Sequence, residues 1–309
     1  MHDLVLVPSF YRPEFLYLCL EKILAARGGS EKEIWVSQDR HITDSINLRL
    51  MLPEISQVIA DFRPKFRIPI RYVERRPHQC IGNVLNFLEL YKDAYHSPGL
   101  RYVYMIEEDV HIGPDFFDWH EAINLKRNYF CSVGWHCIRN PEIEAAGPSI
   151  DSKAYIETSR DFSSIGVCWK RETLGEIVPH ACDTYYRNHR DYMRLMFPKS
   201  PIPAAQWTEQ AGLIMRLILD AGDRKVVAWP EVPRCAHLGI NGYHRPSGYK
   251  FRGSLADKVE ALRQASTTTE KISSLSRDRF DDVSALPEAS AWSPDDLYVS
   301  KTFKWEGKL

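Results

Sequence analysis

Short runs of apolar residues alternate with segments of helical periodicity in the N-terminal part of the chain. The runs at 4–7, 33–37, 70–73 and 102–106 are too short for helices and predict strands. Between them, apolar residues recur every three or four positions, as on one face of a helix: Leu16, Leu20, Ile23 and Leu24; Ile46, Leu50, Leu52, Ile55 and Ile59; Ile81, Val84, Leu85, Leu88 and Tyr95. This β-α alternation predicts an α/β fold with a mostly parallel, doubly wound sheet.

The second half of the chain is less regular. Its pattern predicts strands at 130–134 and 226–229 and a helix at 208–221. Beyond residue 253 the sequence becomes charged and rich in Ser and Thr, with one helix predicted at 255–264. We therefore expect one domain over 1–253 and a helical or irregular C-terminal extension over 254–309, which either packs back on the core or makes a separate contact.

Three consecutive acids, Glu107, Glu108 and Asp109, follow the predicted strand 102–106. Their carboxylates repel one another, and a cation relieves this repulsion best. Hard oxygen ligands suit Mg2+ or Mn2+, which commonly bridge to phosphate oxygens. An ordinary acidic loop after a buried strand is the alternative interpretation. Ligands of parallel sheets bind at the carboxyl ends of strands, so these acids should lie near the segment 8–12 and near Asp39.

Composition narrows the class of protein. The net charge of −1 provides no global field that favours nucleic acid or an anionic membrane. The seven cysteines lack CxxC spacing, which argues against a zinc ribbon or a disulfide framework and favours reduced thiols in a cytoplasm. No stretch reaches the roughly 18 apolar residues of a membrane helix, and no signal peptide precedes the first strand. We expect a soluble cytoplasmic protein without a membrane span.

Four segments carry a resemblance to a known family: 10–13 with the helix at 19–24, 36–39, 107–117, and 230–234 followed by Gly239. In this order they resemble the first nucleotide-binding loop, the uridine-contacting strand end, the DXD-like metal motif and the approach to the donor-closing loop of GT-A glycosyltransferases. Specifically, they resemble N-acetylglucosaminyltransferase I and its O-mannose-linked relatives. The resemblance implies a Rossmann-like GT-A domain with a nucleotide-sugar half at 1–125 and a smaller acceptor half at 126–253.

The resemblance implies a UDP-sugar donor whose diphosphate is held by Mn2+ or Mg2+. By position, Asp109 ligates the metal, while Glu107 and Glu108 hold its water ligands or the ribose. Asp39 accepts a hydrogen bond from the uracil imide, and Arg12 contacts the base or a phosphate unless it is a solvated surface arginine. The implied donor-binding residues are Pro8, Ser9, Arg12, Asp39, Glu107 and Glu108.

His237 occupies a position where many GT-A enzymes place a metal-ligating histidine. N-acetylglucosaminyltransferase I and its O-mannose-linked relatives lack this histidine. Neutral imidazole suits Mn2+, and a structural histidine is the alternative. Glycines make the following loop, 237–253, flexible enough to close over a donor. The glycines, and the loop residues that would meet phosphate or face solvent, are Gly239, Gly242, Gly248, Tyr243, His244, Arg245 and Lys250.

Inverting transfer needs a general base for the acceptor hydroxyl. The segment 207–210 resembles the family's Trp followed by two acids, but Thr208 replaces the first acid, which leaves Glu209. A glutamate that stabilises the first helical turn is the alternative. Asp191 is the second candidate base. The resemblance also places Trp135 and His136 on the acceptor side and 163–166 near the transferred sugar.

The acceptor is a glycan or, as in phage DNA-glycosylating enzymes, a hydroxymethylated base in DNA. The basic, aromatic-rich stretch 63–78 suits phosphate contacts or a plain solvated face, and we favour the latter. Nucleotidyl transfer is a second class of function, but the loop 8–13 lacks the glycines that cradle a triphosphate. A non-catalytic nucleotide-sugar-binding protein is the third.

Overall fold

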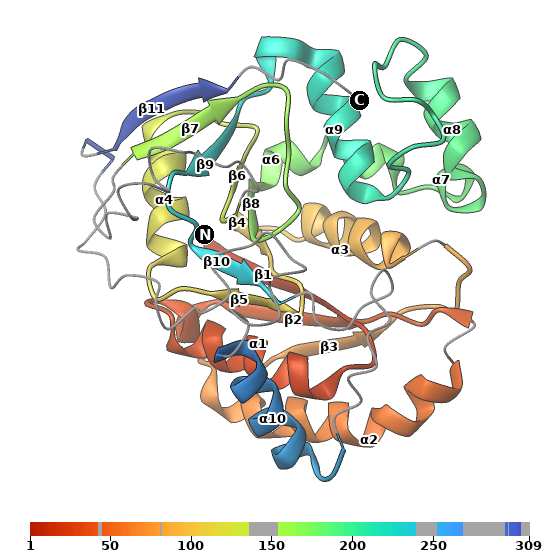
Figure 1. The fold of residues 1–309 in the computed structure, drawn as a ribbon, viewed down its shortest axis with the longest axis vertical. Coiled ribbons are helices and arrows are strands. Elements are labelled where there is room, and N and C mark those ends of the chain that lie inside the picture. The colour runs from red at the N-terminus through yellow and green to blue at the C-terminus, as the bar shows by residue number, and fades with distance from the viewer. Residues whose placement is uncertain are drawn as a thin grey trace.

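The computed structural model describes residues 1–42, 45–80, 82–135, 154–238, 252–267, 294–295 and 297–303. In this part of the chain a nine-stranded sheet has the order β11-β7-β9-β6-β8-β4-β1-β2-β3, and a two-stranded sheet joins β10 to β5 (Figure 1). The strands are β1 (His2–Ser9), β2 (Glu33–Gln38), β3 (Arg71–Glu74), β4 (Leu100–Met105), β5 (Val110–Ile112), β6 (Cys131–Val133), β7 (Ala154–Thr158), β8 (Val167–Lys170), β9 (Val227–Pro230), β10 (Cys235–His237) and β11 (Tyr298–Phe303).

The helices connect and cover these strands. The α-helices are α1 (Pro13–Ala25), α2 (Ser45–Phe62), α3 (Val84–His96), α4 (Phe116–Lys126), α6 (Arg171–Leu174), α7 (Asp183–Arg187), α8 (His189–Met196), α9 (Gln210–Ala221) and α10 (Leu255–Thr267). Short 3-10 turns are η1 (Gly29–Glu31), η3 (Arg63–Lys65), η4 (Val178–His180) and η5 (Gly222–Arg224).

The half of the sheet formed by β4, β1, β2 and β3 is parallel throughout, because β1 pairs in parallel with β2 and β4 and β2 pairs in parallel with β3. Helices α1 and α2 lie on one face and α3 on the other (Figure 1). Side chains of β1 alternate accordingly: Leu4 and Leu6 join the core on the α3 face, and Val5 and Val7 join the core on the α1 face. The predicted α/β fold with a mostly parallel sheet is confirmed.

The other half of the sheet is mixed. β8 pairs antiparallel with β4 and β6, and β7 pairs antiparallel with β9. The strands predicted at 130–134 and 226–229 are β6 and β9, and the predicted helix 208–221 is α9, which begins two residues later. The sequence pattern missed β7 and β8, since four- or five-residue strands among polar neighbours lack a clear period.

The C-terminal segment packs back on the core wherever the structure describes it. Helix α10 lies on α1, where Val259 and Leu262 bury against Phe15 and Leu18. Strand β11 extends the sheet in parallel with β7. The proposed boundary after residue 253 and the two functional halves stay predictions. The tail residues Trp292 and Trp305 lie outside the described residues.

The structure can be compared with the composition-based predictions on membrane helices and on cysteines. Within the described ranges no helix has the length and apolar character needed to cross a membrane. The described cysteines are free thiols rather than disulfides, as the absence of a disulfide pattern indicated.

Candidate active site

Three polar strand ends meet at the carboxyl edge of the parallel half-sheet, as the sequence predicted. The end of β1 joins the end of β2 because the Asp39 amide donates to the Ser9 carbonyl at 2.8 Å. The acids after β4 lie beside the same end of β1, where Ser9 and Glu108 bond directly. Pro8 is buried one position earlier, opposite Ser37 of β2.

Glu108 anchors the loop between β1 and α1. Its side chain is 1% exposed and accepts hydrogen bonds from the Ser9 hydroxyl at 2.6 Å, the Phe10 amide at 2.9 Å and the Arg12 Nε at 2.6 Å. Burial raises the pKa of Glu108, although Arg12 and Ser9 favour its charged form. Both oxygens are therefore occupied by this loop, and a contact with ribose or with water ligands of a metal stays a prediction.

Asp109 keeps one oxygen without a partner. Its Oδ2 accepts from Arg12 Nη1 at 3.1 Å and lies 3.5 Å from His237 Nε2, whereas its buried Oδ1 has no hydrogen-bond partner among the described residues. Burial works against the charge, but Arg12 and His237 hold the pKa of Asp109 well below its usual range. Asp109 is thus an ionised carboxylate with a free, desolvated oxygen.

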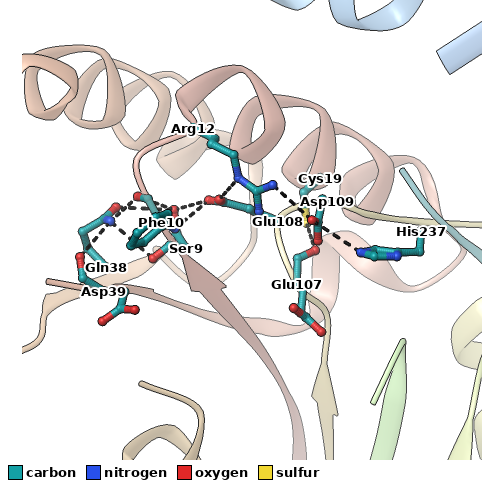
Figure 2. Close-up of polar contacts among 10 residues, drawn as sticks. All are labelled: Ser9, Phe10, Arg12, Cys19, Gln38, Asp39, Glu107, Glu108, Asp109 and His237. Carbon is teal, nitrogen blue, oxygen red and sulfur yellow. Dashed lines mark hydrogen bonds and ion pairs between the residues drawn. The ribbon is translucent and has the colours of Figure 1, made fainter. Parts of the chain in front are cut away.

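Glu107 and His237 complete this group of charges (Figure 2). Burial and then repulsion from Asp109 raise the pKa of Glu107 to about 7. Burial disfavours a charged His237, but Asp109 and Glu107 raise its pKa to about 9. Figure 2 shows Glu108 and Asp109 pointing toward Arg12, with Glu107 pointing away. Two buried carboxylates thus face Arg12 with a third carboxyl group beside them, an arrangement that an added cation would stabilise.

The residues present fit a divalent cation that the donor completes. Within the described residues, no group of three or more His, Cys, Asp or Glu side chains could hold a metal by itself. Mg2+ and similar ions are commonly bound through one or two carboxylates plus substrate phosphates. The free Oδ1 of Asp109 and the imidazole of His237 match that smaller donor set.

The two-stranded sheet brings His237 to the acids. β10 pairs antiparallel with β5, so that His237 lies opposite Val110, and the Leu238 amide donates to the Asp109 carbonyl at 2.8 Å. The sequence pattern missed both strands, because each has only three residues.

Asp39 forms a second unsatisfied carboxylate. It is 2% exposed, and its Oδ1 accepts from the Arg40 amide at 2.7 Å and contacts His78 Nε2, while its Oδ2 has no partner among the described residues. Burial opposes the charge on His78, but Asp39 raises the pKa of His78 to about 9. Sequence reasoning placed His78 in a basic stretch and missed this pairing, which only the return of the chain after β3 creates.

Two arginines of the basic stretch 63–78 are paired with acids of the protein. Arg75 donates to Ser37 Oγ at 2.7 Å and pairs with Asp93 at 2.8 Å, and its side chain is 10% exposed. Arg76 pairs with Asp183 at 3.1 Å, and Arg71 lies over the ring of Trp35. Arg75 is therefore a buried structural cation rather than part of a solvated face.

Glu209 is the N-cap residue of α9, but its side chain makes no capping hydrogen bond. Just before it, Trp207 has a φ of 45° and is 49% exposed. Buried Arg216 fixes this turn by donating to the Trp207 and Gly212 carbonyls at 2.8 and 2.9 Å. Gly212 is required, because a Cβ there would lie 1.7 Å from the Trp207 oxygen. Glu209 thus begins a rigid helix and keeps its carboxylate free of the cap.

A chain of contacts joins the Glu209 segment to the Asp39 end of the site. The Cys80 amide nitrogen lies 3.1 Å from His78 Nδ1, and the Cys80 thiol donates to the Tyr186 carbonyl at 3.5 Å. The neighbouring Tyr185 hydroxyl donates to the Thr208 carbonyl at 2.6 Å. Helix α7 therefore connects both segments.

Asp191 lies in the first turn of α8, with its side chain 60% exposed. It accepts from Asn188 Nδ2 at 2.6 Å and pairs with Arg194 at 3.1 Å. These are contacts of an ordinary helix N-terminus, and no described contact joins Asp191 to the acids after β4. Its role as a base stays a prediction.

Several predicted site residues lie outside the described residues, namely His136, Gly239, Gly242, Tyr243, His244, Arg245, Gly248 and Lys250. Trp135 is partly buried against the core on the α1 face. In the segment 163–166, the Gly166 carbonyl accepts from the Gly134 amide at 2.7 Å.

No family model and no curated protein matches this sequence. Similar solved structures include S. aureus TarS 1–349 in complex with UDP-GlcNAc, at 12% identity and a TM-score of 0.45, over 90% of this chain and 76% of that chain. A longer S. aureus TarS chain matches over 57% of this chain and 29% of its own length, at 13% identity and a TM-score of 0.39.

Another similar structure is the mannosyltransferase PcManGT from Pyrobaculum calidifontis in complex with GDP-Man and Mn2+, at 15% identity and a TM-score of 0.37, over 57% of this chain and 46% of that chain. The galactosyltransferase LgtC with donor and acceptor sugar analogs matches at 9% identity and a TM-score of 0.41, over 70% of each chain. These are remote likenesses, and nothing about the chemistry of this chain follows from them. The specific resemblance to N-acetylglucosaminyltransferase I stays a prediction.

Proposed function

We propose that the protein is a metal-dependent, inverting glycosyltransferase that moves a sugar from a UDP-sugar to an acceptor hydroxyl. The observation that carries this proposal is Asp109, an ionised, buried carboxylate whose Oδ1 has no partner among the described residues and whose other oxygen lies between Arg12 and His237. A buried carboxylate oxygen without a partner is costly unless a ligand satisfies it.

The donor would lie across the two unsatisfied carboxylates. Asp39 would accept the uracil imide N–H through its free Oδ2, while His78 holds the other oxygen. Asp109 and His237 would hold Mn2+ or Mg2+, which when bound supplies a Lewis acid that stabilises the leaving diphosphate. Arg12 would add a fixed positive charge on the same side.

Glu209 would act as the general base. The acceptor oxygen attacks the anomeric carbon and gives its proton to the Glu209 carboxylate, while the bond from that carbon to the diphosphate oxygen breaks and UDP leaves with the electron pair. The Glu209 carboxylate makes no capping hydrogen bond, and this fact and the contacts through Tyr185 favour this residue. Asp191 is the second candidate, although Asn188 and Arg194 already engage it.

The acceptor is proposed to be a saccharide hydroxyl. The DNA alternative is less favoured, because Arg75 and Arg76, two of the bases in 63–78, are paired with Asp93 and Asp183. Nucleotidyl transfer remains disfavoured by the glycine-free segment 8–13.

The test is UDP release from a panel of UDP-sugars with Mn2+ or EDTA, in the presence of simple glycans or hydroxymethylated duplex DNA. We expect metal-dependent release that glycans stimulate and that Asp109→Asn abolishes. Asp3→Asn is the matched control, since Asp3 is a buried, ion-paired aspartate at the opposite end of β1. Stimulation by DNA alone would move the acceptor to DNA, and the absence of UDP-sugar binding would overturn the proposal.

A further inference from the structure

A second buried ion pair lies next to the charges around Asp109. Arg234 is 1% exposed and Asp115 is fully buried, and Arg234 Nη1 lies 3.4 Å from Asp115 Oδ2. Burial lowers the pKa of Arg234, and the negative Asp115 opposes this effect. Asp115 is the N-cap residue of α4, and Arg234 comes immediately before β10, which ends in His237.

The backbone around Arg234 is fixed on both sides. Its amide donates to the Gly134 carbonyl at 2.7 Å, and its carbonyl accepts from the Gly113 amide at 2.8 Å. From there β10 pairs with β5 residue by residue, up to His237 opposite Val110. The Arg234–Asp115 pair thus lies at one end of this short ladder, and His237 with Asp109 lies at the other.

The function of this short ladder depends on the register in which β10 pairs with β5. A slip of one residue turns every side chain of a strand to the opposite face, which would turn His237 away from Asp109. Three residue pairs give little register specificity by themselves. A buried ion pair is weak evidence for stability, because apolar residues of similar volume often do as well, and selection of one register is a better-attested use of buried polar groups.

We propose that Asp115 and Arg234 are positioning residues that fix the register of β10 on β5 and so hold His237 against Asp109 for divalent-cation binding. This inference rests on the proposed function, since the cation is the one that would hold the donor diphosphate. Neither residue touches the cation; both act through His237.

The test is titration of the full-length protein with Mn2+ in the presence of UDP, in which the electron paramagnetic resonance signal of free Mn2+ measures how much of the ion remains unbound. We expect Asp115→Asn to weaken Mn2+ binding about tenfold or more, as changes to groups that orient metal ligands do. Asp3→Asn, the same change at the opposite end of the sheet, should leave Mn2+ affinity unchanged. Thermal melts identify which variants fold, and if Asp115→Asn does not fold, Arg234→Lys carries the test with the same expected direction.

A double-mutant cycle separates positioning from general damage. In a His237→Ala background, Asp115→Asn should weaken Mn2+ binding no further, because its effect passes through His237. A further loss of affinity there would overturn the inference, and so would equal Mn2+ affinity of wild type and folded Asp115→Asn. Failure of the wild type to bind Mn2+ in the presence of UDP would instead overturn the metal-dependent function itself.

Discussion

Two clusters of charged side chains lie at opposite ends of the central strands, and they differ in how many of their buried oxygens have a partner. The basal cluster, at the start of β1, contains Asp3, Lys32, Arg101 and Glu121. The acid cluster, beyond the ends of β1 and β4, contains Arg12, Glu107, Glu108, Asp109 and His237.

In the basal cluster, two acids meet two bases. Asp3 Oδ1 accepts from Arg101 at 2.9 Å, and Asp3 Oδ2 accepts from Lys32 at 2.7 Å and from Arg101 at 2.8 Å. In the acid cluster, Asp109 keeps a free buried oxygen and the pKa of Glu107 rises to about 7. In the basal cluster both Asp3 oxygens thus have partners, whereas the acid cluster carries an electrostatic cost that a ligand would relieve.

The largest expected effect separates the two clusters directly. Asp109→Asn should reduce UDP-sugar turnover at least about a thousandfold, because it removes the charge that would hold the cation and diphosphate. Asp3→Asn should leave turnover intact and lower the free energy of unfolding by about 1 to 2 kcal/mol, because Lys32 and Arg101 lose one charged partner but keep Glu121. Steady-state kinetics and urea denaturation measure the two effects; equal loss of turnover in both folded variants would erase the distinction between the clusters.

The next effect tests whether Glu209 acts as the general base for a donor held by the acid cluster. Glu209→Gln should lower kcat about a hundredfold or more, with UDP affinity unchanged, because general-base catalysis contributes about that much. Asp191→Asn should change kcat little, since its carboxylate serves the start of α8. The reverse ranking of these two variants would make Asp191 the base.

A smaller effect tests the second free carboxylate. Asp39→Asn should weaken UDP binding about tenfold to a hundredfold, as expected when a buried polar contact to the ligand is lost, and should leave Mn2+ affinity unchanged. Isothermal titration with UDP and with Mn2+ separates the two. Unchanged UDP affinity would show that Asp39 does not contact the base.

The last effect concerns stability against pH rather than turnover or binding. Pairing with Asp39 raises the pKa of His78 from 6.5 to about 9, so the protonated ring stabilises the folded state. This stabilisation is fully present below about pH 6.5 and is lost as the pH rises through about 9, and it is on the order of 3 kcal/mol. Urea denaturation of wild type and His78→Gln should therefore converge at high pH; a constant difference across this range would contradict the pairing.

The sequence predicted at which end of the sheet the site lies, but it did not predict which side chains of the site pair with one another. The hydrophobic pattern located the strand ends, and this was enough to predict that Ser9, Asp39 and Asp109 lie close together, because the carboxyl ends of parallel strands share one edge of the sheet. The pairing of Asp39 with His78, and of Asp115 with Arg234, joins residues from separate elements and leaves no periodic signal. The three-residue strands β5 and β10, which place His237, are likewise too short to show a pattern.

The most direct test of the central claim is calorimetric titration of UDP into the protein with Mn2+ and with EDTA. If the acid cluster holds the cation, UDP should bind tightly with Mn2+ and at least about tenfold more weakly in EDTA. In Asp109→Asn, Mn2+ should no longer strengthen UDP binding. UDP affinity that is the same with Mn2+, with EDTA and in Asp109→Asn would contradict a cation held by Asp109.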